Sequence, residues 1–234
     1  MNGATINNLI EILVKISEKL PITLTIMVLS LLFGLILGLV TAIIRIRKRP
    51  ISYAIATFYL SIMRCTPALV QLFLIFFGLP YLLMLMNINI NGWNKITFVV
   101  IAFSLHMAAN LSEVIRSAYL SVGNNQLEAA YSVGMSYFQA IRRIILPQAF
   151  AIALPNLGND CIMLLKDTSL AFTIGIVDIM GEVRIIVGNN YGINEFQVYM
   201  VISLIYWAIT IAIENGVRYL DQRLNRGHVS ISKY

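Results

Sequence analysis

The sequence has little charge, few cysteines and few histidines. Only 12% of its 234 residues are charged, whereas 59% are hydrophobic, and the mean hydropathy is +0.80. A soluble domain has about 25% charged residues and roughly half apolar ones, so this composition indicates an integral membrane protein. The two cysteines, Cys65 and Cys161, form no CxxC motif, so neither a zinc site nor a disulfide framework is indicated.

Motifs for chemistry are missing as well. No phosphate-binding loop of the form GxxxxGKS or GxxxxGKT occurs, which excludes ATP hydrolysis by that route. The two histidines, His106 and His228, are too far apart in the sequence to suggest a catalytic constellation. We therefore expect a chain that is not an enzyme and has no catalytic residues, metal site or cofactor of its own.

The net charge of +6 is explained by membrane topology rather than by nucleic acid binding. Basic residues gather at the ends of apolar segments, and no basic run is interleaved with aromatic residues. By the positive-inside rule such clusters lie on the cytoplasmic side. The clusters are Arg45–Arg49, Arg142 with Arg143, and Arg218 to Lys233.

Long apolar runs predict an all-α membrane protein with five transmembrane helices. The expected spans are Leu20 to Ile44, one within Ile51 to Met86, Ile96 to about Tyr119, about Phe150 to Leu165, and Phe196 to about Ile213. The second run is too long for one perpendicular helix, and Pro67 is expected to break it. Five spans place the N-terminus outside and the C-terminus in the cytoplasm. Residues 1–19 form an amphipathic segment, residues 20–224 the membrane domain, and residues 225–234 a cytoplasmic tail.

A polar interruption separates the third and fourth spans. Its centre carries Glu128, small residues and a glycine, and Pro147 opens the next apolar segment. Small residues allow a short helix to seat closely against a partner, and an acidic residue favours a helix N-terminus. The alternative is a solvated linker between two spans, since small residues and prolines are common there.

This interruption resembles the EAA loop of permease subunits of ABC importers. The residues that fit the loop motif are Glu128, Ala129, Ala130, Gly134, Ile144, Leu146 and Pro147. Arg64 to Gln71 is similar to that family's Arg-Gly-Thr-Pro-x-Leu-Val-Gln, although Cys65 replaces the glycine. Leu146 to Ala149 and Leu164 to Leu170 resemble stretches typical of the polar amino acid uptake branch, although Ala151 stands where arginine is common. The similarity covers about Pro21 to Leu224.

The resemblance implies a type I importer fold in a multi-pass protein of the bacterial inner (cell) membrane. It implies that the loop at about 124–147 couples the chain to a cytosolic ABC ATPase, which binds ATP and Mg²⁺. It also implies a second permease copy or a paralogue, and an extracellular or periplasmic amino-acid-binding protein. The coupling residues would be Glu128, Ala129, Ala130, Ser132 and Gly134.

Polar residues inside the expected spans are candidates for a substrate site, because ionisable groups are costly in lipid. His106, Asn110 and Glu113 share one face of the third span, and Asn156, Asp160 and Met163 share one face of the fourth. Two carboxylates would suit a cationic side chain. The favoured substrate is therefore a basic amino acid such as arginine, lysine or histidine.

Several alternatives remain open at this stage. Glu113 could pair with Arg116, and His106 could be a hydrogen-bonded packing residue. The chain could serve an importer of glutamine, cystine or another polar amino acid. A gradient-driven secondary transporter would use Glu113 and Asp160 as ion sites, but such proteins usually contain internal repeats, and none is visible.

Overall fold

A computed structural model describes residues 3–225, and these residues contain helices and no strands. Residues 226–234 of the expected tail lie outside them. In chain order the elements are α1 (Gly3–Ser17), α2 (Leu20–Arg47), α3 (Pro50–Cys65), α4 (Ala68–Phe73), η1 (Leu74–Gly78), α5 (Leu79–Met84), α6 (Lys95–Ser121), α7 (Asn124–Ser132), α8 (Tyr137–Ala140), η2 (Ile141–Ile145), α9 (Leu146–Asp167), η3 (Thr168–Ile174), α10 (Ile179–Asn189) and α11 (Glu195–Asn225).

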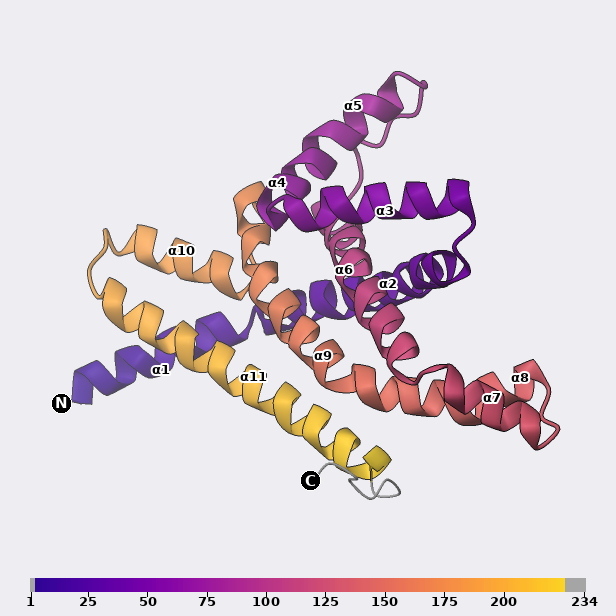
Figure 1. Ribbon diagram of the computed structural model, residues 1–234. Helices are drawn as coiled ribbons and strands as arrows, with labels where there is room; N and C mark the ends of the chain where they lie inside the picture. Colours follow the sequence, from indigo (N-terminus) through magenta and orange to yellow (C-terminus); the bar gives the residue numbers. More distant parts are fainter. Residues whose placement is uncertain (1–2, 226–234) are drawn as a thin grey trace.

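Helix α6 lies at the centre of the fold, packed against α2 and α9 (Figure 1). Lipid gives apolar helices no hydrophobic reason to associate, so close packing of small residues is what holds them together. Gly34 and Gly38 of α2 supply it. A Cβ atom at Gly34 would lie only 2.9 Å from Cβ of Met107, and one at Gly38 would lie 3.1 Å from the carbonyl oxygen of Ala108. The two backbones therefore approach as closely as glycine permits.

A second packed region joins the N-terminal helix to the C-terminal part of the chain. Ile12 and Ile16 of α1 are buried in a cluster with Val183 of α10 and Val198 of α11. Figure 1 shows α1 crossing α11, with α10 above them, at the end of the molecule away from α7 and α8. Helix α1 thus packs part of its apolar surface, Ile12 and Ile16, on other helices of the same chain, whereas Ile10 and Leu13 are exposed.

The chain bends sharply at Pro67, as the sequence predicts. Helix α3 ends at Cys65, α4 begins at Ala68, and the two helical segments meet at 112°. Pro67 has an extended backbone and Thr66 closes the end of α3 by donating its N–H to the carbonyl of Ile62 at 3.1 Å. Proline lacks an N–H group and disfavours helix in the residue before it, so the break falls here.

Two π-helical turns are also explained by a proline that follows them. The turn η1 ends just before Leu79-Pro80, and η2 ends just before Leu146-Pro147. A proline clashes with the carbonyl group one turn earlier, and a widened turn removes that clash without ending the helix. The rod from α8 through η2 into α9 is therefore continuous.

Within residues 3–225, three helical stretches are long and apolar enough to cross a membrane. They are Asn8–Arg47, Lys95–Ser121 and Glu195–Leu224, and the bent pair Pro50–Cys65 with Ala68–Met84 makes a fourth if it is counted as one span. Helix α9, the fourth of the five expected spans, is interrupted by polar residues and is not among them. The number of five and the orientation of the termini stay predictions.

Candidate functional site

A polar chain crosses from the bend at Pro67 to the centre of α6. The amide nitrogen of the buried Gln71 donates to the carbonyl oxygens of Met63 at 2.8 Å and Thr66 at 3.0 Å. Its amide oxygen faces Nδ1 of His106 at 3.0 Å. Nδ1 must therefore carry the hydrogen, which leaves Nε2 of a neutral ring to accept from the amide of Asn110 at 3.4 Å. His106 is thus hydrogen-bonded through both ring nitrogens, and whether it also meets substrate stays a prediction.

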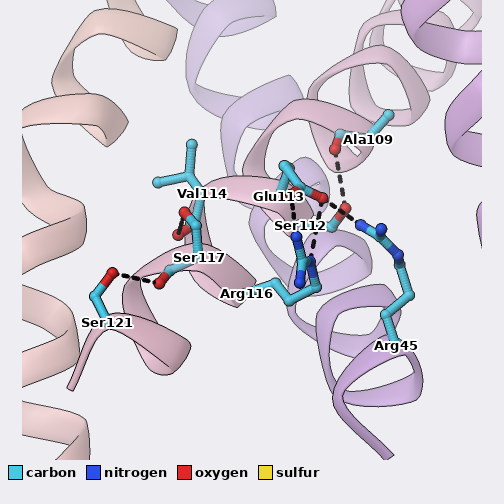
Figure 2. Close-up of polar contacts among 8 residues, drawn as sticks. All are labelled: Arg45, Ala109, Ser112, Glu113, Val114, Arg116, Ser117 and Ser121. Carbon is cyan, nitrogen blue, oxygen red and sulfur yellow. Dashed lines mark hydrogen bonds and ion pairs between the residues drawn. The ribbon is translucent and has the colours of Figure 1, made fainter. Parts of the chain in front are cut away.

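Glu113, one turn further along α6, is held by two arginines (Figure 2). Arg45 of α2 donates from Nη1 to Oε2, and Arg116 donates from Nη2 to Oε1 and from Nε to Oε2, the last at 3.3 Å. The pair with Arg116 is the alternative that the spacing in the sequence had suggested. Both carboxylate oxygens are occupied, so a cation at Glu113 would have to compete with guanidinium groups. Whether Glu113 also meets substrate stays a prediction.

The polar residues of α9 are arranged differently. Asp160 is half-buried, and its Oδ2 atom is buried with no hydrogen-bond partner among the described residues. Arg64, at the end of α3, is near enough to act on it electrostatically without a direct ion pair within residues 3–225. Asn156 and Met163, on the same face of α9, are exposed. A buried carboxylate oxygen without a partner calls for a donor or a cation.

The structure brings these two groups of residues onto neighbouring helices, since α6 and α9 pack together. Within the described chain, no hydrogen bond joins His106, Asn110 or Glu113 to the polar residues of α9. The sequence reasoning missed Gln71 and Arg45 as parts of the site. Gln71 is a polar residue in an apolar run, which was an available signal, whereas Arg45 was interpreted only as a marker of topology.

The polar interruption folds into a helical hairpin, α7 and α8, which we call the α7–α8 hairpin. Gly134 turns the chain with a positive φ of 78°, and Met135 donates its N–H to the carbonyl of Ala130 at 3.1 Å. Ser136 and Gln139 form a capping box that starts α8. The hairpin thus closes its turn with local hydrogen bonds, and Gly134 adopts its positive φ without the strain that a side chain would add.

The predicted coupling residues differ in accessibility. Glu128, Ala129 and Ser132 are exposed, whereas Ala130 is buried within the hairpin, and the Ser132 hydroxyl donates to the carbonyl of Glu128 at 3.0 Å. Two large apolar side chains that the sequence reasoning did not single out, Val133 and Phe138, are 76% and 70% exposed. The hairpin projects beyond the ends of α6 and α9 (Figure 1). An exposed apolar tip of this kind is typical of an interaction site.

The comparisons with known proteins agree with this arrangement. Residues 30–226 match the family described as binding-protein-dependent transport system inner membrane component. The L-cystine transport system permease protein TcyL of Bacillus subtilis is 40% identical over 190 residues, covering 81% of this chain and 79% of TcyL. The nopaline transport system permease protein NocM of Agrobacterium fabrum is 36% identical over 188 residues, covering 79% and 77%.

A solved structure described as an amino acid ABC transporter with histidines has a TM-score of 0.79 and 30% identity, covering 95% of this chain and 99% of that one. The fold, together with the hairpin, therefore defines a permease subunit with the type I ABC importer architecture. This chain belongs to the family of binding-protein-dependent transport system inner membrane components, and it is an amino acid ABC transporter permease. It is a transport component rather than an enzyme, and its family implies an ATPase partner.

Proposed function

We propose that this permease carries polar amino acids across the bacterial inner membrane, with preference for basic ones, and that Asp160 receives their cationic group. The observation that carries this proposal is the buried Oδ2 atom of Asp160, which lacks a partner among the described residues. A guanidinium or ammonium group would supply both the hydrogen bond and the opposite charge. The solved transporter described with histidines supports the same class of substrate.

The other polar residues have supporting roles in this proposal. Asn156 and Met163 extend the face of Asp160 on α9, and Asn110, oriented by His106, offers amide hydrogen-bonding groups from α6. Glu113 contributes through the arginines that it holds. A substrate that binds the outward and inward states with different affinity drives the switch between them.

Energy enters through the α7–α8 hairpin, in our proposal. The cytosolic ATPase docks on Glu128, Ala129 and Ser132 and on the exposed Val133, while Ala130 and Gly134 shape the hairpin from within. The continuous rod from α8 through η2 into α9 carries the movement toward Asp160. A second permease chain and an amino-acid-binding protein complete the importer. Membership in the family disfavours the gradient-driven alternative.

Replacement of Asp160 tests the substrate site. In the reconstituted complex, Asp160→Asn should lower uptake of arginine, lysine or histidine about tenfold or more, or change the selectivity, because a charge-assisted hydrogen bond is lost. Glu214→Gln, the same chemical change at an exposed position of α11, is the matched control and should keep uptake. Unchanged uptake and selectivity in Asp160→Asn complexes would reject the role of Asp160.

Replacement of Val133 tests the docking surface. Val133→Asp should prevent copurification of the ATPase, because a charge would enter an apolar contact. Ile193→Asp is the control, since Ile193 is 66% exposed in the turn between α10 and α11, at the other end of the molecule (Figure 1). Equal ATPase recovery from both variants would argue against docking at the hairpin.

A second candidate substrate class is cystine and other uncharged or zwitterionic polar amino acids. TcyL, a relative named for L-cystine, shares 40% identity over most of both chains, which favours this candidate. A panel of amino acids, each presented with the binding protein to the reconstituted complex, separates the two classes by stimulated ATP hydrolysis. Stimulation by cystine or glutamine alone would replace the basic preference with the alternative.

A further inference from the structure

The cluster of Arg45, Glu113 and Arg116 carries more positive than negative charge. Two guanidinium groups and one carboxylate give +2 − 1 = +1. Arg45 lies in the basic cluster at the end of α2, whereas Glu113 and Arg116 lie within α6, and charged groups on membrane helices normally have a partner or a function. The side chains of Arg45, Glu113 and Arg116 are 12%, 26% and 27% exposed, so the cluster is neither sealed nor fully solvated. Solvent therefore reaches the cluster on its open side.

The open side of the cluster differs from the lipid-facing surfaces of the chain. On α2 the exposed side chains are large and apolar, for example Leu32, Ile36 and Val40. On α6 the incompletely buried residues include His106, Asn110, Glu113 and Arg116 beside apolar ones such as Leu105 and Val114. Polar side chains of this density suit a water-filled pathway rather than hydrocarbon. The cluster thus lies on the same face of α6 as the residues of the proposed substrate pathway.

Donors remain available on both arginines. Each guanidinium has five N–H groups, and Glu113 occupies one nitrogen of Arg45 and two of Arg116. The Nε atom of Arg45 is buried and has no acceptor among residues 3–225. Glu113 thereby holds two planar donor groups close together, which is the arrangement that binds a carboxylate through paired hydrogen bonds.

We propose that Arg45 and Arg116 bind the α-carboxylate of the transported amino acid and that Glu113 positions them. This inference rests on the proposed substrate pathway and deepens it: Asp160 takes the cationic group and the arginine cluster takes the anionic group. Every amino acid has an α-carboxylate, so the cluster serves recognition that does not depend on the side chain. Glu113 is in this view a positioning residue that competes with substrate for the same donors.

The test measures binding to the permease–ATPase complex without the binding protein, whose own selectivity would otherwise dominate. The probes are arginine and cystine, each compared with its carboxyl amide, and inorganic phosphate serves as a competing anion. The intact complex should bind each free acid about tenfold or more tightly than its amide, as expected for a charge-assisted pair. Competition by phosphate with no preference for acid over amide would show an unspecific anion site and overturn the proposal.

The variants separate the roles of the charged residues. Arg116→Gln and Arg45→Gln should reduce the preference for the free acid to about twofold or less, and the lysine variants should restore part of it, because lysine keeps the charge but not the planar fork. Glu113→Gln should increase the preference severalfold, since it releases two guanidinium groups. Direct binding of a cation by Glu113 predicts instead that Glu113→Gln weakens binding of acid and amide alike and leaves the preference between them unchanged.

The variants distinguish the cation site at Asp160 from the carboxylate site at Arg45 and Arg116. Asp160→Asn should weaken binding of acid and amide alike and leave the preference between them intact. Binding that is indifferent to Asp160→Asn would reject the cation site, whereas an unchanged acid preference in Arg116→Gln would reject the carboxylate site. Arg116→Lys, which retains the charge beside Glu113, keeps the second result informative if Arg116→Gln fails to assemble. If Arg116→Lys keeps the full preference of the intact complex, the proposal is overturned.

Discussion

Helices α6 and α11 are both long and apolar enough to span the membrane, yet they occupy opposite environments. In the most apolar stretch of α6, 61% of the residues are buried in the chain, whereas the corresponding value for α11 is 17%. The difference teaches that apolar character identifies a span without telling a central helix from a peripheral one. What distinguishes the two is the character of the residues left uncovered.

The partly covered residues of α6 include polar and charged side chains, whereas the large apolar side chains of α11 are exposed. The exposed large side chains of α11 include Phe196, Leu204 and Trp207, which suit lipid or another apolar surface. The incompletely covered face of α6 carries the histidine, the amide and the charged cluster described above. In our proposal the polar residues on the open face of α6 line the pathway, whereas the apolar open face of α11 lies at the periphery.

The largest effect is expected when a bulky residue replaces a glycine that faces α6, compared with a glycine of α11. Gly34→Leu should prevent α2 from reaching α6, because even a Cβ atom would lie 2.9 Å from Cβ of Met107, whereas nothing lies within 4 Å at Gly216 of α11. Overpacking costs about 1–3 kcal/mol, and more where backbones must separate. Size-exclusion chromatography should show loss of the monodisperse complex for Gly34→Leu alone. Similar profiles for Gly34→Leu and Gly216→Leu would remove the distinction between the helices.

A smaller effect is expected from the polar chain beside α6. Gln71→Ala leaves the Nδ1–H group of His106 and the carbonyl of Met63 without the hydrogen bonds that Gln71 makes to them. Leaving a buried polar group unpaired costs about 1–3 kcal/mol, so thermal unfolding of the purified permease complex should occur at a lower temperature. Gln222→Ala, at an exposed site of α11, is the control and should change little. An equal response of both variants would mean that the chain does not stabilise the fold.

The smallest expected effect concerns one hydroxyl group. Tyr59 of α3 donates to the carbonyl of Leu105 in α6 at 2.6 Å, whereas Tyr219 of α11 is 61% exposed. Tyr59→Phe should lower stability by about 1 kcal/mol and Tyr219→Phe by less, measured by the same unfolding assay. If the order is reversed, the link between α3 and α6 is weaker than its geometry indicates.

Much of the fold follows from local features of the sequence. Pro67 predicts the sharp bend, and Glu128 to Gly134 predict a short helix between spans, because proline geometry and small residues act within one or two turns. The loop motif and the stretch from Arg64 to Gln71 had indicated the family, and the match over residues 30–226 confirms it. These predictions succeeded because they depend on neighbours in sequence.

The site was harder to predict, for a physical reason. The partner of Glu113 on α2, Arg45, lies 68 positions away in the chain, and only packing of α2 on α6 brings them together. Helical periodicity placed His106, Asn110 and Glu113 on one face. It could not show that Gln71 is hydrogen-bonded to His106 or that Arg45 and Arg116 are paired with Glu113. Asp160 stands apart because no hydrogen-bond partner among residues 3–225 reaches its buried Oδ2 atom.

The local closure of the α7–α8 hairpin has a consequence for partner choice. Its turn, its capping box and its buried Ala130 are all supplied from between Asn124 and Ala140. The hairpin can therefore keep its shape through its own hydrogen bonds while its outward residues vary. If the ATPase docks on the hairpin as proposed, grafting these residues between related permeases should transfer the choice of ATPase and leave the choice of amino acid with the recipient. The ATPase partner and the substrate of such an importer can then evolve separately.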